Sequence, residues 1–516
     1  MTTAATVIKQ NYLDIALEAI VDLFAGAGGM STAIEEALGR SPDVAVNHDD
    51  DALSMHRVNH PQTTHYTADV FEIDPRAAMR GRPVGLLHLS PDCTHHSQSS
   101  AGKPRDRKIR SLTWVGYRWA AQVRPRIVTL ENVYQILLWS RLIAKRDPVT
   151  KRVVKIDGSV AAPGERVPVQ QQFLVPDRRR LGETWNQFVA KLRGLGYQVE
   201  WQRVRASDFG APTIRERLFM VARCDGKSIL WPEPTHSKAP ASGKKPWRGA
   251  HECIDWSIPC PSILDRKRPL KDATLRRIVK GVFTEVLRTA TPFIVPIAHS
   301  LVPLDGDGSS RTCQAATQAA AFMMQANDGW NLRWPSRSLR APMSTITTTG
   351  SQQQLTMAYL VQLRRHCYGR NLRDPLMTIS AQGEHHGLVC CTLSKSDRDG
   401  ALRVARLLAQ HGDVPRFDRM SEEDRLDLVT VEVGDAKYLI VGLGLRMLVA
   451  SELYRAQGFP DSYVFERGHD GRVFSKTTQV RLVGNSVSPP PATAIIALNA
   501  ADLALRPVRF VRSRAA

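Results

Sequence analysis

The sequence predicts an α/β fold built on a doubly wound, mostly parallel sheet. Three observations support this prediction. Short apolar runs alternate with helix-like segments through the first third of the chain, a glycine-rich turn follows the first run, and polar residues stand where several runs end. Apolar runs of this kind are typical of strands buried on both faces, and their alternation with helices is typical of parallel sheets.

The elements are expected in the order strand, turn, helix. The apolar run IVDLF, residues 20–24, is the first expected strand, and it enters the turn AGAGG at 25–29. The segment MSTAIEEALG, residues 30–39, has helical periodicity and closes on a glycine, which suits a helix C-terminus. Further strands are expected in VAVNH (44–48), VGLLHLS (84–90), PRIVTLENV (125–133) and RLFMVAR (217–223), and an amphipathic helix in TWNQFVAKLRGLGY (184–197). Ligands of such sheets bind where the strands end.

The composition indicates a globular protein that binds a polyanion. The 516 residues suffice for two or three domains, and 43% of them are hydrophobic and 23% charged. The net charge of +20 favours nucleic acid as a partner, with a membrane surface as the second candidate. No apolar run is long enough to span a bilayer, and acids within the N-terminal apolar stretch argue against a signal peptide. The eight cysteines form no CxxC pair, so we expect a reducing cytoplasm and neither a zinc finger nor a disulfide framework.

Changes in composition divide the chain. Residues 1–230 carry the alternating pattern, which a basic segment at about 141–180, rich in proline and glycine, interrupts as an expected surface insertion. In 231–439, proline, serine, threonine and glutamine become frequent, and LRAPMSTITTTG resembles LRDPLMTISAQG, as a duplicated extended element would. Helical periodicity returns in 440–516, which contains a second expected glycine turn, RLVGNSVSPPP.

The turn VDLFAGAGG is a candidate ligand site. Glycines let a backbone approach a ligand closely, and the helix that follows presents its N-terminus. The turn lacks the GxGxxG spacing of dinucleotide-binding folds and the GK[ST] of a P-loop, so a purely structural turn is an equal alternative. The end of the next strand, where an acid commonly holds a ribose, carries Asn47, His48 and Asp49.

The stretch SPDCTHH places Cys93 just past the end of an expected strand. Zinc would need three or four convergent ligands, and beyond His95 and His96 the nearest further cysteine is remote. A redox role lacks a resolving cysteine nearby, whereas a buried inert cysteine is a strong alternative. The polar turn and the basic residues that follow favour a reactive thiol, because positive charge stabilises a thiolate.

Three more charged residues stand at strand ends. Glu131 of LENV ends an apolar strand, where a carboxylate is costly to desolvate unless it is paired or functional; a surface acid is the alternative. Arg215 and Arg217 of TIRER enter a strand two residues apart, so both can point to one face. Either they clamp a phosphate or a carboxylate, or they are a solvated pair.

Taken in order, the motifs resemble those of a known family. The series is DLFAGAGG, SPDC, ENV, APTIRERLFMVA, LYRAQGFPDSY and VRLVGNSVSPP, and it resembles the DNA (cytosine-5)-methyltransferase family over nearly the whole chain. SPDCTHH and the Asn-His strand end are similar to the phage- and prophage-associated branch. The resemblance implies a Rossmann-like fold that uses S-adenosylmethionine, with a target-recognition domain inserted at 231–439 and a C-terminal segment, 440–516, that returns to the catalytic domain.

The resemblance also implies residue roles. Cys93 would be the nucleophile that adds to carbon 6 of cytosine, Glu131 would contact ring N3 and the amine, and Arg215, supported by Arg217, would bind the carbonyl oxygen. Asp69 of TADVF would meet the adenine amine. The implied cofactor residues are Phe24, Ala25, Gly26, Gly28, Gly29, Asn47, His48, Asp49, Asp69, Val70, Asn485, Ser486 and Val487.

Such enzymes flip the target base out of the duplex. The segment after Cys93 would then close over DNA and its phosphates. The cations expected to do so are Lys103, Arg105, Arg107, Lys108 and Arg110, although a solvated basic loop is the alternative. His385 and His386 are candidates for base contacts and equally for ordinary loop residues.

The chain departs from the family pattern at several positions. Asp92 and Thr94 flank the cysteine where the family usually has Pro-Cys-Gln, and a nearby carboxylate would raise the thiol pKa. Asn47 stands in place of the usual ribose acid, and Thr213 in place of a glutamine before the arginine pair. None of these changes removes the nucleophile or Glu131, so an active enzyme is expected.

The leading prediction is a DNA (cytosine-5)-methyltransferase, part of a restriction-modification system or phage-encoded. It would act on double-stranded DNA as a monomer, without metal or membrane, in the cytoplasm and nucleoid of a bacterial or phage-infected cell. The alternatives are a tRNA cytosine-5 methyltransferase, a catalytically silent DNA-binding protein of the same fold, and transfer of an alkyl group other than methyl.

Overall fold

The computed structural model describes most of the chain, in two compact units. The described residues are 18–93, 96, 104–240, 243–289, 322–325, 337–338, 353–363, 369–381, 386–412, 414, 417–433 and 436–504. Unit 1 falls within 1–211, 215–245 and 458–516, and unit 2 within 212–214 and 246–457. The chain thus passes between the units at 211/212, 214/215, 245/246 and 457/458, and the sequence suggested boundaries at 230/231 and 439/440.

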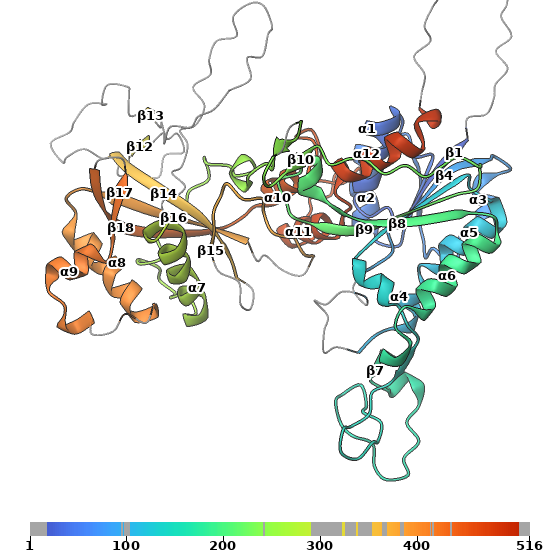
Figure 1. Cartoon of the computed structure of the whole chain (residues 1–516), viewed down its shortest axis with the longest axis horizontal. Coiled ribbons are helices and arrows are strands. Elements are labelled where there is room, and N and C mark those ends of the chain that lie inside the picture. Colours follow the sequence, from blue (N-terminus) through green and yellow to red (C-terminus); the bar gives the residue numbers. More distant parts are fainter. Residues whose placement is uncertain are drawn as a thin grey trace, which may run out of the picture. The chain divides into compact units, whose positions relative to one another are not determined.

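Unit 1 is built on a seven-stranded sheet in the order β3-β2-β1-β4-β5-β9-β8. The strands are β1 (Ala19–Leu23), β2 (Val44–Asn47), β3 (Thr64–Thr67), β4 (Val84–Leu89), β5 (Ile127–Asn132), β8 (Gln198–Arg205) and β9 (Glu216–Arg223). The first five run parallel, whereas β9 runs antiparallel to both β5 and β8. The predicted mostly parallel α/β sheet is therefore confirmed (Figure 1).

Helices cover both faces of this sheet. The apolar side chains of α5 (Trp114–Val123) and α6 (Glu183–Gly194) pack on one face, and those of α1 (Gly29–Leu38) and α12 (Pro489–Asn499) on the other. Unit 1 also contains α2 (Asp50–Asn59), α3 (Pro75–Met79), α4 (Arg107–Ser111) and α11 (Lys476–Asn485). The sheet is thus doubly wound, as the alternating sequence predicted.

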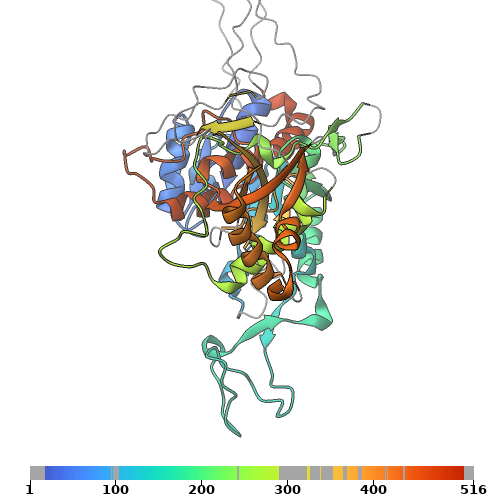
Figure 2. The same cartoon turned by 90° about the vertical axis from the view of Figure 1, so that its left-hand side faces the viewer.

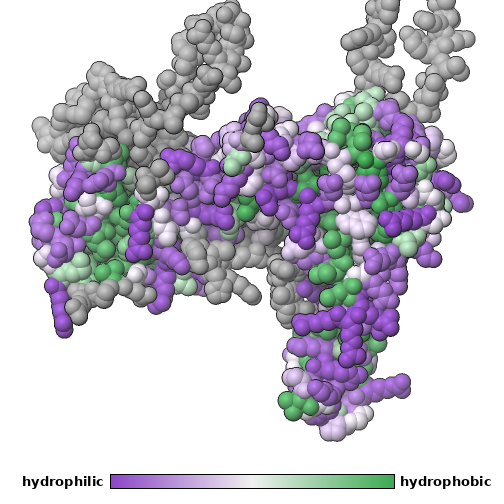
Figure 3. All heavy atoms as spheres, viewed as in Figure 1, coloured by the Kyte–Doolittle hydropathy of each residue, from purple (hydrophilic) through white to green (hydrophobic). Residues whose placement is uncertain are grey.

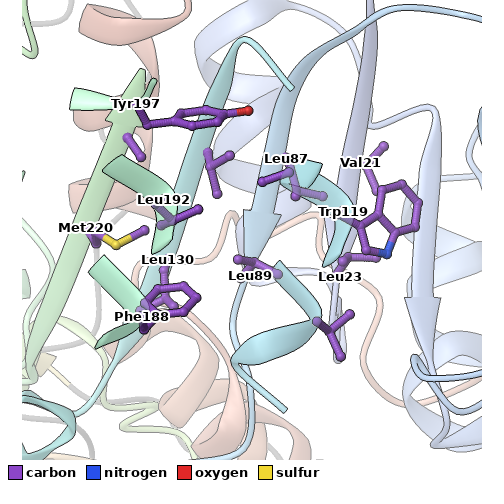
Figure 4. Close-up of a cluster of buried hydrophobic side chains, with 14 of the residues drawn as sticks. Val21, Leu23, Leu87, Leu89, Trp119, Leu130, Phe188, Leu192, Tyr197 and Met220 are labelled. Carbon is purple, nitrogen blue, oxygen red and sulfur yellow. The ribbon is translucent and has the colours of Figure 1, made fainter. Parts of the chain in front are cut away.

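The face under α5 and α6 has an apolar core. Val21, Leu23, Leu87 and Leu89 from the central strands point toward Trp119 of α5, as Figure 4 shows. All five are fully buried, and each large side chain buried in this way contributes about 1.5–3 kcal/mol. This packing keeps the strands in register and so holds their carboxyl ends together.

The opposite face carries a polar row that the apolar strand patterns did not predict. Asp22 on β1 is level with His88 on β4, and His88 with Thr129 on β5; all three are buried. His88 Nδ1 lies 2.9 Å from Thr129 Oγ1, and Ser31 Oγ donates to Asp22 Oδ2 at 2.7 Å. Burial raises the pKa of Asp22 to about 7 and lowers that of His88 to about 3.

The end of unit 1 differs from the sequence expectation. The sequence predicted a glycine turn over RLVGNSVSPPP, but its first residues are helical, because Gly484 lies inside α11. Ser475 caps the N-terminus of that helix. The turn comes after Asn485 and is short, since α12 begins with Pro489. Proline at the first position suits a helix start, because it lacks only an N–H that would have no partner there.

An arm, which we define as residues 141–180, interrupts unit 1 between β5 and α6. Its base is the antiparallel pair of β6 (Leu142–Ala144) and β7 (Leu174–Pro176). Figures 1 and 2 both show the arm, in teal, standing away from the sheet. A ribbon of β10 (His236–Ser237) and β11 (Lys245–Pro246) lies further along the chain.

Unit 2 is built on an antiparallel sheet in the order β13-β12-β14-β16-β18-β17, with β15 beside β14. Its elements are α7 (Asp272–Val282), β12 (Phe322–Gln325), β13 (Arg337–Ser338), β14 (Gln353–Gln362), β15 (Gly369–Arg370), β16 (His386–Ser394), α8 (Arg398–His411), α9 (Glu422–Asp427), β17 (Thr430–Val433), β18 (Ala436–Met447) and α10 (Ala450–Gln457). Buried side chains of α7 and α8 pack on this sheet. The first of the two similar segments, 339–350, and His385 lie outside the described residues. Among the residues described, no helix is long and apolar enough to cross a membrane.

Candidate active site

Cys93 lies in a turn that two neighbouring strands hold in place. The turn leaves the end of β4, where Ser90 Oγ donates to Phe24 O at 3.1 Å. From the other side, Asn132 Nδ2 at the end of β5 donates to Pro91 O at 2.9 Å, in a buried bond. The thiol that follows is half-buried. The side chain therefore stands at the carboxyl edge of the sheet on a fixed backbone.

Glu131, Arg215 and Arg217 meet beside this turn. Glu131 of β5 is buried, and its Oε1 lies 3.2 Å from Arg217 Nε. Among the described residues, no hydrogen bond reaches Glu131 Oε1. Burial raises the pKa of the Glu131 carboxyl, and the charges of Arg217 and Arg215 act in the opposite direction. The charge of Arg217 thus holds the buried carboxylate, although no donor among the described residues is aligned to hydrogen-bond its Oε1.

The same residues set the state of the thiol. Burial raises the pKa of Cys93, which keeps the thiol protonated at neutral pH. The positive charges of Arg217 and Arg215 lower this pKa, whereas the negative charges of Glu131 and Asp92 raise it. The effect of Asp92 has the direction expected from its place beside the cysteine. The structure therefore brings together the four residues predicted to be catalytic, although burial opposes the thiolate that basic neighbours were expected to favour.

Arg215 also holds the C-terminal part of unit 1. It is buried, and its guanidinium donates to Gly484 O at 3.0 Å and to Ser486 O at 2.8 Å. Burial lowers the pKa of Arg215, but the guanidinium stays charged at neutral pH. Ser486 and Val487 are buried against Gly29, where a Cβ would lie 2.2 Å from Ser486 Oγ and from Val487 O. This close approach brings the glycine turn and the GNSV segment together.

The glycine turn is tightly folded between β1 and α1. Phe24 has a φ of 64°, and Gly26 and Gly28 have φ values of 54° and 94°. A left-handed phenylalanine is strained by roughly 1–3 kcal/mol, and such strain gathers at functional sites. Ala25 is buried and donates to Val46 O at 3.1 Å. A Cβ on Gly28 would lie 2.8 Å from the hydroxyl of Tyr463, which itself donates to Ala27 O, so the turn leaves room for backbone only.

The next strand ends carry the other polar candidates. Asn47 accepts from the Asp49 N–H at 2.9 Å, His48 is exposed, and Asp49 pairs with Arg481 of α11. Asp69 accepts from Phe71 N at 3.1 Å, and Val70 beside it is buried. Asn485, at the end of α11, is exposed. The predicted cofactor residues thus stand on neighbouring loops at one edge of the sheet.

The cations of the predicted DNA-contacting segment differ in their exposure and in their contacts. Lys103 lies outside the described residues, and Arg107 is exposed. Lys108 Nζ lies 2.7 Å from Asp69 Oδ2, and the Lys108 ammonium lowers the pKa of that acid. Arg105 is half-buried. Arg110 is 5% exposed and donates to Ser140 O at 3.1 Å, so its guanidinium supports the fold here, and its role at DNA phosphates stays a prediction.

Three contacts at the site were not predicted. Asn132 holds the turn before the nucleophile, Tyr463 closes the glycine turn, and Arg481 binds Asp49. Asn132 belongs to the ENV motif, so the motif contained the signal. Tyr463 ends the motif LYRAQGFPDSY and Arg481 lies in VRLVGNSVSPP, so these motifs contained both residues. Their contacts could not be predicted locally, because each joins residues more than 400 positions apart in the sequence.

Metal binding finds no support in the part of the chain that the structure describes. No group of three or more His, Cys, Asp or Glu side chains there is placed to hold a metal ion. His95 lies outside the described residues, and the ring of His96 lies 5.7 Å from that of Trp139, edge to face. Cys93 stands beside the carboxylate of Glu131 and the guanidinium groups of Arg215 and Arg217.

Comparison with known proteins agrees with this geometry. Residues 19–141 and 173–251 match the family of C-5 cytosine-specific DNA methylases. Over these residues the chain is similar to those DNA methylases. The matched segments contain Cys93, Glu131, Arg215 and Arg217, and the interval between them falls in the arm.

Curated proteins match over less than half of the chain. The type II methyltransferase M.AgeI of Thalassovita gelatinovora is 26% identical over 229 residues, which are 43% of this chain and 43% of M.AgeI. M.AquIA of Picosynechococcus is 26% identical over 222 residues, 42% of this chain and 76% of that protein. The chain thus spans less than half the length of M.AgeI. A solved structure of a putative DNA modification methyltransferase from an E. coli prophage covers 93% of this chain and 97% of its own, with 15% identity and a TM-score of 0.43.

Proposed function

We propose that the chain is a DNA (cytosine-5)-methyltransferase that moves a methyl group from S-adenosylmethionine to carbon 5 of a flipped-out cytosine through an adduct on Cys93. The observation that carries the proposal is the cluster of Cys93, Glu131, Arg215 and Arg217 at the carboxyl edge of the sheet. A nucleophile, a buried carboxyl and two fixed cations are what this chemistry requires. The family match supports the same activity.

The cofactor loop fits S-adenosylmethionine. Gly26 and Gly28 keep side chains out of the turn, and the left-handed backbone at Phe24 shapes it. Asp69 offers a carboxylate for the adenine amine, and Asn47 or Asp49 a polar group for the ribose. When bound, S-adenosylmethionine supplies an electrophilic methyl group.

The chain's own residues prepare the cytosine. The Cys93 thiol loses its proton to water, the thiolate sulfur bonds to carbon 6, and the ring π electrons move to carbon 5. Glu131, whose pKa burial raises, holds a proton at N3 and so stabilises the electron-rich ring. Arg215 hydrogen-bonds the carbonyl oxygen, and Arg217 fixes the carboxyl. Once the methyl group is bonded to carbon 5, water takes the proton from that carbon and the electron pair left behind restores the double bond between carbons 5 and 6. The bond from sulfur to carbon 6 then breaks with its electron pair on sulfur, which frees the Cys93 thiolate.

The partner is duplex DNA. The net charge of +20 suits a polyanion, and extruding a base costs a few kcal/mol that phosphate contacts offset. Arg107 and Lys108 are the exposed cations of the segment after the nucleophile. Lys108 contacts Asp69 in this structure, so cofactor binding at Asp69 would release the lysine toward DNA. We assign base recognition to unit 2.

The test is methylation of duplex DNA of mixed sequence with labelled S-adenosylmethionine, followed by base-resolution sequencing. We expect 5-methylcytosine in a short repeated context with the natural chain and none with Cys93→Ala. The matched control is Cys224→Ala, which changes a half-buried cysteine beyond the far end of β9 and should stay active.

Two further arms separate the alternatives. Duplex DNA carrying 5-fluorocytosine should trap a covalent adduct that Cys93→Ala cannot form, which excludes a silent DNA-binding protein. Transfer to tRNA with none to DNA would overturn the proposed substrate. Transfer to DNA that survives Cys93→Ala would overturn the proposed nucleophile.

A further inference from the structure

The arm is an addition to the family fold. The family match stops at residue 141 and resumes at 173, so the excluded interval, 142–172, lies wholly within the arm. The sequence marked this segment as basic, and neither the sheet nor the proposed site uses it. It therefore needs an explanation of its own.

The arm is a built structure. Asp147 Oδ1 accepts from Thr150 N at 2.7 Å and ties one turn, and Asp157 Oδ1 accepts from Ser159 N at 2.9 Å and ties another. Bridges of β type join its two sides, and a small set of side chains is buried inside it: Val154, Ala161, Val167 and Leu174. A segment held in this way presents its surface in a fixed arrangement.

The acids of the arm are engaged in local contacts, whereas most of its cations are exposed. Residues 141–180 contain ten Lys and Arg but only four Asp and Glu. All four acids are engaged in local contacts, namely Asp147 and Asp157 in their turns, Glu165 with Lys155, and Asp177 with Arg141. Among the described residues, these seven cations of the arm have no ion-pair partner: Lys145, Arg146, Lys151, Arg152, Arg166, Arg178 and Arg179. Figure 3 shows a mainly hydrophilic arm surface.

The base of the arm adjoins the catalytic edge of unit 1. The arm begins ten residues after Glu131, because it leaves the carboxyl end of β5. Arg105 N donates to Leu174 O at 3.0 Å, and the Arg110 guanidinium donates to Ser140 O. The arm is thus tied to the segment that follows Cys93, at the edge where a DNA substrate must lie for its cytosine to reach the thiol.

We propose that the arm is a second duplex-binding element, which places unpaired cations on the phosphates that flank the flipped cytosine. The inference rests on the proposed function, since it needs DNA at that edge. Exposed Arg166, Arg178 and Arg179 are the contacts, because none of the ion pairs among the described residues engages their guanidinium groups. Affinity for DNA falls as the salt concentration rises, and each phosphate contact steepens the plot of log affinity against log salt concentration by about 0.9.

A protein partner is the competing explanation. Val149 is 85% exposed and Ile156 56% exposed, and apolar surface of this kind also suits protein contacts. The charge favours DNA, because the cations outnumber the acids by six across the arm (ten minus four). A Val149→Ser/Ile156→Ser variant separates the two partners, since it removes apolar surface and no charge.

The experiment measures affinity for a mixed-sequence duplex over a salt series, using the full chain with saturating S-adenosylmethionine. The arm variant combines Arg166→Gln, Arg178→Gln and Arg179→Gln. The matched control changes three exposed cations at the amino-end edge of the sheet, Arg80, Arg124 and Lys191, to glutamine. A third variant replaces the same three arm arginines with lysine, which keeps the charge.

We expect the arm variant to lower the salt slope by up to about 2.7 and the control variant to leave it unchanged. The lysine variant should keep most of the salt slope. That result would show that the arm variant loses slope because it loses charge and not because it misfolds. Equal salt slopes for the arm variant and the control variant would overturn the inference. It would also be overturned if the arm variant left the salt slope unchanged while Val149→Ser/Ile156→Ser altered self-association of the chain. If the natural chain methylates no DNA, the proposed function fails first, and methylation without an arm effect refutes the arm alone.

Discussion

Gly29→Ala tests whether the glycine turn and the GNSV segment act as one unit. Gly29 is the first residue of α1, and its φ is not in the left-handed region, so backbone strain does not exclude alanine. An added Cβ would lie 2.2 Å from Ser486 Oγ and from Val487 O. The hydroxyl can rotate away, but the carbonyl belongs to the backbone, so the segment must move.

Two effects of opposite sign compete. Alanine in place of glycine in a helix stabilises by roughly 0.5–1 kcal/mol. Overpacking a closed contact costs about 1–3 kcal/mol. Movement of the segment also weakens two hydrogen bonds from Arg215, to Gly484 O and Ser486 O, and bonds from charged donors contribute about 1.5–3 kcal/mol each. The destabilising effects are therefore larger, and the free energy of unfolding should fall by about 2 kcal/mol.

The assay is thermal unfolding together with S-adenosylmethionine binding. Gly29→Ala should unfold a few degrees lower and bind the cofactor more weakly. Gly194→Ala is the matched control, because Gly194 ends α6 and a Cβ there meets nothing within 4 Å. That variant should be as stable as the natural chain or up to about 1 kcal/mol more stable. If the two alanine variants unfold alike, the close approach at Gly29 does not hold the two segments together.

Two further predictions concern buried charge. Glu452 is fully buried and accepts hydrogen bonds from both terminal nitrogens of Arg446, at 2.6 and 2.9 Å. Glu452→Gln removes the charge that pairs with this guanidinium, so unit 2 should lose about 3–5 kcal/mol of stability and unfold about 6–20 °C lower. An unchanged melting temperature would contradict this prediction. His88 has a pKa of about 3 in the folded protein, compared with about 6.5 for an ordinary histidine. As the pH falls, the unfolded chain therefore binds a proton at this residue before the folded chain does. The stability of the fold should fall by about 1.4 kcal/mol per pH unit between about pH 6.5 and pH 3. His88→Gln, which can still contact Thr129, should unfold with a shallower dependence on pH in urea titrations, and parallel profiles would refute this.

Much of the fold could be predicted because its signals are local. The strands β1, β2, β4 and β5 follow from apolar runs, and α1 follows from its periodicity and its glycine end. The positions of Cys93 and Glu131 at strand ends follow from the same pattern, because a residue just after a buried strand must come out at the edge of the sheet. Motif order then predicted the family that the comparisons support.

Other features depend on contacts between residues far apart in the sequence. Nothing local shows that β9 runs antiparallel to β5, that Arg215 binds the carbonyls of Gly484 and Ser486, or that Arg110 is buried. Hydropathy also missed the polar row of Asp22 and His88, since each polar residue stands singly in an apolar strand and only strand pairing aligns them.

The sequence by itself determined the sheet, the places where strands end and the residue types that stand there. Only the tertiary structure decided which of those residues meet, which charges are paired and which are left on the surface. The arm shows the difference, because its charge is visible in the sequence while the engagement of its acids is not. The physical reason is that periodicity and turn propensity act over a few residues, whereas burial and charge pairing are set by whichever distant segment packs alongside.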